Sequence, residues 1–345
     1  MLQINSGKLY PNGVQRTNEL RGVLYSNLRL IRQEDGPIVT KAGRLLQVDA
    51  ASLPRPLVYE VTEQFEDNIM ASGVLISHGV QPYLQDFAAV VSFVLRVTCT
   101  PDAELCARLL GGKRSLNVRT APDKLVRRVF DKDVWFDQAD DALLQSFVAD
   151  LIALKRKSFL AAMKAIRTYV TGLHRVADDL ELAYILFVAS LESLAQAFDG
   201  HRAQWSDYDQ AKRHRIDKAL TSADDQIADR VRGAVLEGEH SALARRFRDF
   251  VLGHAPDAYF VEGNRVGAPG RLDLRDALRE AYDLRSKYVH RLSQLPNLLD
   301  AELSYSETIR SGHATYLTLE GLSRIARQVI MEFVARQPKV RDRDV

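Results

Sequence analysis

The spacing of hydrophobic and polar positions changes near residue 137. Before that point, short stretches rich in β-branched and aromatic residues alternate with turn signals made of proline, glycine, asparagine and aspartate. This pattern predicts strands over residues 22–32, 38–48 and 57–65. Residues 81–100 suit either an amphipathic helix or, at 90–97, a buried strand, and we favour a strand at the end of the segment.

After residue 140 the apolar positions recur every three or four residues, which predicts helices. The first apolar stripe consists of Leu143, Leu144, Phe147, Val148, Leu151 and Ile152. A second stripe covers residues 160–173, and an almost entirely apolar helix is expected over 178–198, capped by Asp178 or Asp179 and closed by Gly200. Such a helix belongs in the middle of a bundle. Further helices are predicted over residues 208–220, 226–236, 242–252, 274–292 and 319–336.

Together these patterns predict an α+β fold with two domains. A β-rich domain is expected over residues 1–137, an all-α helical bundle over 141–336, and a polar tail over 337–345. The length of 345 residues accommodates two domains, and a content of 46% hydrophobic and 27% charged residues is that of a soluble globular protein. We interpret the first domain as a sensor or regulatory domain, which is an inference from architecture alone.

Charge and cysteine content restrict the candidate functions. The net charge of +2 means that any site for a polyanion must be a local patch. Cys99 and Cys106 are too few for a disulfide framework or a zinc site, and they indicate a reducing cytoplasm. The eight histidines show no metal-ligand spacing, so no metal or cofactor is expected. We also expect no signal peptide and no membrane helix, because the longest apolar stretch, over 87–97, is short and contains Ser92 and Arg96.

One acidic residue stands out in the apolar helix over 178–198. Glu192 is the only charged residue between positions 182 and 198. A buried carboxylate without a partner costs several kcal/mol, so Glu192 should meet a cation from another core helix. We predict that Arg285 is this partner, because it lies on the apolar stripe of its own helix. That stripe consists of Leu274, Leu278, Ala281, Tyr282 and Val289.

Arg285 is followed five positions later by His290, a combination suited to phosphate chemistry. An arginine binds phosphate through two donors, and a histidine takes and returns a proton near neutral pH. An ideal helix separates the two side chains by about 140°, so they would border a cleft rather than touch. Two other arginines also precede a histidine by a similar interval, and we interpret both pairs as ordinary surface residues. They are Arg167/His174 and Arg248/His254.

The two motifs together resemble a known superfamily. The apolar helix with Leu-Glu-Ser-Leu at 191–194, followed after a variable helical segment by Tyr-Asp-Leu-Arg-Ser-Lys-Tyr-Val-His at 282–290, is similar to the HEPN superfamily in its Apea-like form. The resemblance covers residues 141–336 and implies a metal-independent endoribonuclease, common in toxin, CRISPR-associated and anti-phage systems. It further implies that Arg285 and His290 are catalytic, that Ser286 is the polar residue after the arginine, and that Glu192 orients the arginine. RNA, including transfer RNA, would be the substrate, and the cleft would be shared by a homodimer.

Several basic residues are weaker candidates for contact with RNA. Lys287 and Arg291 adjoin the motif, and a basic run over 113–132 holds seven basic residues against two acidic ones. The run supplies Lys113, Arg114, Arg127 and Arg128 as candidates. A solvated linker face explains the run better than an RNA path does.

Two further functional classes compete with the ribonuclease. In the first, the bundle is a non-catalytic scaffold that binds a protein or nucleotide partner, and Glu192 and Arg285 form a structural ion pair. The second, a metal-dependent enzyme, is the weaker, because the acidic residues are scattered. For the ribonuclease, we expect the N-terminal domain to bind a trigger or an inhibitor.

Overall fold

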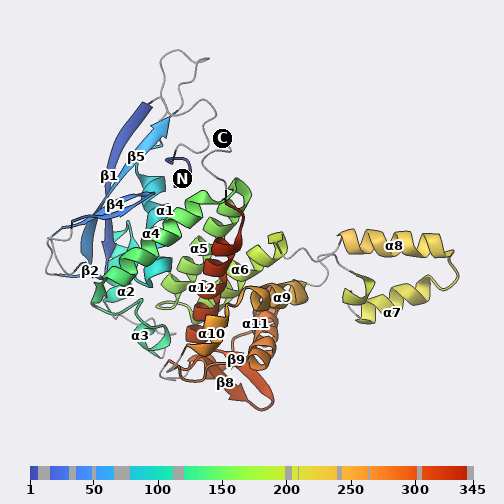
Figure 1. Ribbon diagram of the computed structural model, residues 1–345. Coiled ribbons are helices and arrows are strands. Elements are labelled where there is room, and N and C mark those ends of the chain that lie inside the picture. Colours follow the sequence, from blue (N-terminus) through green and yellow to red (C-terminus); the bar gives the residue numbers. More distant parts are fainter. Residues whose placement is uncertain are drawn as a thin grey trace.

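The structure is a computed structural model, and a sheet and a helical bundle make up its body (Figure 1). It describes residues 1–6, 16–30, 36–48, 52–65, 78–111, 120–198, 204–208, 210–238, 243–262, 265–300 and 305–339. The N-terminal part contains most of the strands and the C-terminal part most of the helices, so the predicted α+β class is confirmed. Lys113, Arg114, Gly200 and most of the predicted polar tail lie outside the described residues.

The main sheet has five strands in the order β3-β4-β5-β1-β6, and all neighbours are antiparallel. The strands are β1 (Arg16–Ser26), β3 (Ile38–Thr40), β4 (Gly43–Gln47), β5 (Arg55–Phe65) and β6 (Cys99–Thr100). In β5, alternate residues Leu57, Tyr59 and Val61 are buried, which is the period of a strand with one face on a core. A parallel pair, β2 (Leu28–Leu30) with β7 (Val134–Phe136), adjoins this sheet.

The segment after residue 80 corrects one prediction, because it is helical where we favoured a strand. Helix α1 (Gln81–Leu95) runs through residues 90–95 and ends at Arg96, whose φ is 55°. One of its faces meets the sheet, where Phe87 stacks on Tyr59 with ring centroids 4.5 Å apart. Its other side meets the bundle, where Phe93 lies edge-on to Tyr169 at 5.3 Å. Since both sides are buried, no polar face marks the helical period in the sequence.

The C-terminal part is a bundle whose helices match the predicted positions within a few residues. It contains α4 (Gln138–Ala153), α5 (Arg156–Arg175), α6 (Leu180–Phe198), α9 (Leu243–His254), α11 (Arg271–Arg291) and α12 (Leu319–Arg336). Helices α5, α9, α11 and α12 all pack against α6. By length and composition α6 could cross a membrane, but here more than half of its most apolar window is buried inside the protein. Asp179 caps α6 as predicted, accepting the Leu182 N–H at 2.9 Å.

A hairpin interrupts the region that we expected to be entirely helical. Strands β8 (Thr308–Ser311) and β9 (Ala314–Leu317) pair antiparallel, and β9 packs against α11. Gly312 takes a φ of 59° at the turn, a conformation that glycine adopts without steric cost. The expectation of an all-α C-terminal bundle is therefore wrong at this hairpin. Among the described residues the body also contains the short helices α2 (Ala103–Leu110), α3 (Pro122–Leu125) and α10 (Asp257–Val261).

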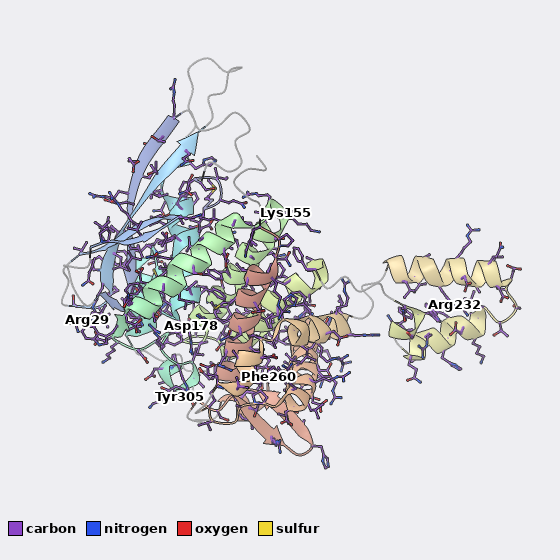
Figure 2. The ribbon with its side chains drawn as sticks, viewed as in Figure 1. Arg29, Lys155, Asp178, Arg232, Phe260 and Tyr305 are labelled. Carbon is purple, nitrogen blue, oxygen red and sulfur yellow. The ribbon has the colours of Figure 1, made fainter. Side chains whose placement is uncertain are left out.

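Helices α7 (Gln210–Ala219) and α8 (Asp225–Gly238) form an arm that projects from the body (Figure 1). Arg232, which Figure 2 labels in the arm, holds the arm together, because its Nη2 lies 2.9 Å from Asp217. Asp217 also accepts the Trp205 indole N–H at 3.1 Å. In the body, the buried apolar side chains of the sheet, α1 and the bundle form one continuous core.

Candidate functional site

The candidate site lies where α6 and α11 pack against each other. The two helices run antiparallel: Glu192 in the second half of α6 meets Arg285, and Glu181 in its first turn accepts the Leu295 N–H at 3.0 Å just beyond the end of α11. Helix α11 ends at Arg291, after which Leu292 takes a left-handed φ of 51°. The inward face of α11 buries Leu274, Ala277, Leu278, Ala281, Tyr282 and Leu284.

The predicted contact between Glu192 and Arg285 is present. The Glu192 side chain is 5% exposed, and its Oε2 lies 2.6 Å from Nη2 of Arg285. The phenol of Tyr282 donates to the other carboxylate oxygen at 3.2 Å. Each carboxylate oxygen therefore has a donor, as a buried charge requires.

Tyr282 is a member of the site that we did not assign a role. Burial, and after it the negative charge of Glu192, raises the pKa of Tyr282 to about 12, so the phenol stays protonated and donates. Its ring also lies 5.5 Å from that of Phe247 on α9. Its position one turn before Arg285 on the same apolar stripe was the available signal.

Arg285 retains donors that the protein does not use. Its side chain is 22% exposed, so the guanidinium reaches towards solvent from the core pair. Its Nε is enclosed and has no hydrogen-bond acceptor among the described residues. A guanidinium has five N–H donors, so a group held by Glu192 on one side can still bind an anion on another.

His290 and its neighbours lie on the solvent side of the last turns of α11. His290, Lys287 and Arg291 are exposed, and Ser286 is half-buried. Val289, which we placed on the buried stripe, is 48% exposed, so the stripe ends before it. A basic side chain at this position also interacts favourably with the helix C-terminus, whatever its chemical role.

Acidic groups border the same end of α11. Desolvation, followed by the negative charges of Asp179 and Glu181, raises the pKa of Tyr288. The first turn of α6 thus brings carboxylates close to the basic end of α11, and the surface there carries both signs of charge.

The two described arginines of the basic run are partly exposed and contact other parts of the protein. The Arg127 amide donates to Glu320 at 2.8 Å, and its guanidinium lies over the Tyr305 ring at 4.6 Å. Arg128 pairs with Asp140 at 2.5 Å. These contacts tie the segment after α3 to α12 and α4, and none of them joins the run to the site on α11.

The other two arginine–histidine pairs match the expectation of surface residues only in part, because the Arg167 side chain is 53% exposed whereas His174 and His254 are half-buried. Arg167 donates from Nη2 to the buried Asp86 at 2.5 Å, an acidic partner that its sequence neighbours did not reveal. His174 is not an ordinary surface residue, because its Nε2 is enclosed without a partner in the described part of the chain and burial lowers its pKa to about 4. His254 stacks on Phe250 with centroids 4.1 Å apart and contacts the Phe250 carbonyl through Nδ1.

Within the described ranges, no three His, Cys, Asp or Glu side chains are grouped as a metal site would need. Comparisons with known proteins add no assignment, since no protein-family model, curated protein or solved structure matches this chain. The case for a function therefore rests on the residues of α6 and α11.

Proposed function

We propose that this protein is a metal-independent endoribonuclease of the HEPN type, in which Arg285 and His290 act on an RNA phosphodiester. The observation that carries the proposal is the Glu192–Arg285 pair, which joins two core helices and holds one side of a guanidinium whose side chain is still 22% exposed. A guanidinium held in this way is preorganised for a phosphate, because its orientation is set before the substrate arrives.

RNA supplies its own nucleophile for such a reaction. The 2′-oxygen attacks the adjacent phosphorus while His290 takes its proton, and the bond to the 5′-oxygen breaks. The 5′-oxygen receives a proton from water, and the His290 imidazolium returns its proton to the solvent. The products are a 2′,3′-cyclic phosphate and a 5′-hydroxyl. Arg285 stabilises the charge that develops on the phosphoryl oxygens. Glu192 and Tyr282 are positioning residues, because they contact Arg285 and each other rather than the substrate.

A symmetric homodimer supports this chemistry better than a single chain. Arg285 points to the Glu192 side of α11, whereas His290 is exposed on its last turn. A two-fold axis beside this end of the helix would place a histidine from one protomer near the arginine of its partner. We accordingly propose a homodimeric effector that acts on RNA, including transfer RNA, in the cytoplasm as a toxin or in anti-phage defence. The sheet-containing N-terminal part would receive the trigger or inhibitor.

The test is cleavage of total RNA and of a transfer-RNA pool in EDTA, comparing wild type with His290→Ala. His313→Ala is the matched control, because His313 is also exposed but lies in the β8–β9 turn. We expect His290→Ala to lose at least about a hundredfold in rate and His313→Ala to keep full activity, with circular dichroism unchanged in both. Cleavage that survives His290→Ala places the active site elsewhere.

One alternative has an observation in its favour. Both carboxylate oxygens of Glu192 are occupied by Tyr282 and Arg285, which is also what a purely structural ion pair between two helices requires. In that case the bundle is a scaffold for a protein or nucleotide partner. Absence of cleavage by the wild type on every RNA tested, with or without magnesium, would favour the scaffold.

A further inference from the structure

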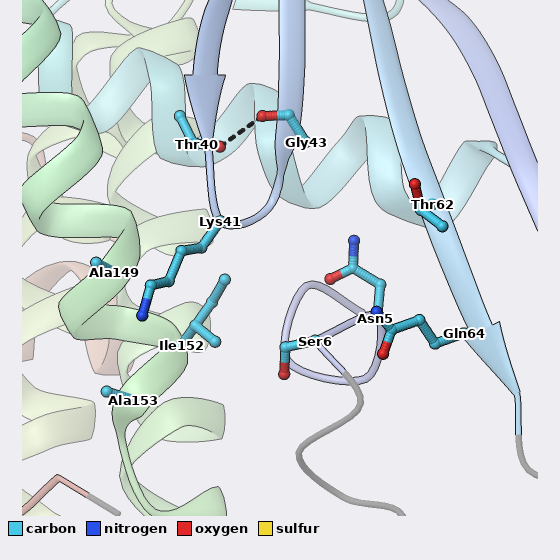
Figure 3. Close-up of a pocket in the computed structure, with 10 residues that line it drawn as sticks. All are labelled: Asn5, Ser6, Thr40, Lys41, Gly43, Thr62, Gln64, Ala149, Ile152 and Ala153. Atoms are coloured by element: carbon cyan, nitrogen blue, oxygen red, sulfur yellow. Dashed lines mark hydrogen bonds between the residues drawn. The ribbon is translucent and has the colours of Figure 1, made fainter. Parts of the chain in front are cut away.

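A polar cavity of about 410 Å³ lies outside the candidate active site, at the junction of the sheet and α4. Residues of the N-terminal segment, the β3–β4 turn and β5 form three sides, and one face of α4 forms the fourth (Figure 3). Its volume falls within the roughly 300–1,000 Å³ that is typical of small-molecule sites.

Asn5 is the most informative residue in this cavity. It is 6% exposed, it lines the cavity, and its Oδ1 has no hydrogen-bond partner among the described residues. A buried acceptor left unsatisfied costs about 1–3 kcal/mol. The segment is held in place nearby, because the Gln3 amide donates to the carbonyls of Ile152 and Leu154 at the end of α4, at 3.0 and 2.6 Å. A ligand that offers an O–H or N–H donor to Asn5 would recover the cost.

The described residues that line the cavity carry a net positive charge. Lys41 lines it from the β3–β4 turn, with its side chain running along the α4 wall beside Ala149 (Figure 3), and no aspartate or glutamate is among the described residues that line it. Thr40 fixes this turn, since its hydroxyl donates to the Gly43 carbonyl at 2.8 Å and accepts the Ala42 N–H at 3.1 Å. A lysine acts as a point charge for phosphate, whereas planar carboxylates are more often bound by arginine.

The remaining lining residues indicate the chemistry of the rest of the ligand. The side chains of Ser6, Thr62 and Gln64 are polar, whereas the α4 wall is apolar and is formed by Ala149, Ile152 and Ala153. A group rich in hydroxyls on one face and carbon on the other matches this division, and a sugar ring has that character.

We propose that this cavity binds a sugar phosphate, either free or as part of a nucleotide. The phosphate pairs with Lys41, a sugar hydroxyl donates to Oδ1 of Asn5, and the carbon face of the sugar lies on Ile152. The proposal is independent of the ribonuclease proposal, because none of these residues belongs to α6 or α11.

The test is isothermal titration of the whole chain with ribose 5-phosphate, adenosine 5′-monophosphate, ribose, adenosine and inorganic phosphate. We expect one or both of the phosphorylated sugars to bind, and ribose, adenosine and inorganic phosphate to bind at least about tenfold more weakly. Preference for ribose 5-phosphate identifies a free sugar phosphate, and preference for adenosine 5′-monophosphate identifies a nucleotide. Equal binding of inorganic phosphate, or no binding of either sugar phosphate up to about 10 mM, overturns the proposal.

Two variants and one control locate the binding site. Lys41→Gln should weaken binding by about tenfold or more, because it removes a charge-assisted contact, and Lys41 is exposed so the fold should persist. Asn5→Ala should also weaken binding, and in the absence of ligand it removes an acceptor that has no partner within the described ranges. Lys164→Gln removes an exposed lysine of α5 that does not line the cavity, and it should leave the affinity unchanged. If Lys41→Gln and Asn5→Ala both bound the sugar phosphate as tightly as Lys164→Gln does, the assignment to this cavity would be overturned.

Discussion

The Glu192–Arg285 pair predicts an unequal response to mutation of its two members. Arg285→Met leaves a carboxylate that is 5% exposed with only the Tyr282 hydroxyl as a donor. Breaking a buried ion pair in this way costs about 3–5 kcal/mol in the free energy of unfolding. Glu192→Gln leaves Arg285 without its charge partner, but that guanidinium is 22% exposed and can turn towards water. The glutamine oxygen can still accept from Tyr282, so we expect a cost of about 1–2 kcal/mol.

The double variant Glu192→Gln/Arg285→Met isolates the coupling between the two side chains. Once the carboxylate is gone, losing the arginine no longer strands a buried charge. The double variant should therefore be more stable than Arg285→Met alone, which gives a coupling energy of about 2–4 kcal/mol. Arg279→Met is the matched control: Arg279 is on the same helix and is 57% exposed beside Asp276 and Glu280, so its loss should cost no more than about 0.5 kcal/mol.

Equilibrium denaturation in urea, followed by circular dichroism, measures all four variants against wild type. The buried-pair argument would be refuted if Arg285→Met cost less than about 1 kcal/mol, or if the two single changes were additive in the double variant. Additivity would mean that the carboxylate does not depend on the guanidinium. Activity assays on the same proteins add a second readout, because His290→Ala should abolish cleavage without the loss of stability expected for Arg285→Met.

Three other predictions follow from buried groups. Gly321→Ala should destabilise the protein by about 1–3 kcal/mol in thermal or urea unfolding, because the added Cβ would clash with the Glu307 carbonyl oxygen. The higher helix propensity of alanine alone would predict a gain, so an unchanged or higher stability would contradict the clash. Burial lowers the pKa of His174 from 6.5 to about 4, so between these pH values the histidine is neutral in the folded protein but protonated in the unfolded chain. The free energy of unfolding should therefore fall by about 3 kcal/mol as the pH drops from about 6.5 to 4. Urea titrations of His174→Gln at pH 7 and pH 4 should lack this part of the decrease. Burial raises the pKa of the Cys99 thiol and raises that of Cys106 to about 12, so mass spectrometry should find both unmodified by iodoacetamide at pH 8 in the folded protein and both alkylated in urea; rapid labelling of the folded chain would show that the thiols are accessible.

Amphipathic helices were the part of the fold that sequence patterns predicted best. Helices α11 and α12 lie where the periodicity placed them, because each packs one face on the core and leaves the other in water. The end of helix α1 was misread as a strand, since the helix is buried between the sheet and α5 and has no polar face to mark its period. The β8–β9 hairpin was missed because its two strands are only four residues long and lie between predicted helices.

The candidate site, like the fold, was only partly predictable from the sequence. A single acidic residue in an apolar helix is evidence in itself that a cation must meet it, so the partnership of Glu192 with Arg285 was predictable from the sequence. The third member, Tyr282, and the exposed position of His290 depend on how α11 is rotated against α6, which local sequence does not specify. The same holds for Arg167, whose partner Asp86 lies on a different helix.

The sequence by itself therefore determined the amphipathic helices of the bundle, the strand-rich character of the N-terminal part, and which charge had to be neutralised in the core. These properties depend on residues close together along the chain, through periodicity, caps and the cost of burying a charge. Only the tertiary structure decided that α1 lies between sheet and bundle, that Tyr282 completes the Glu192 pair, and that Asn5 and Lys41 share one cavity. Those outcomes depend on contacts between segments distant in sequence, whose relative rotation is set by packing of the whole core.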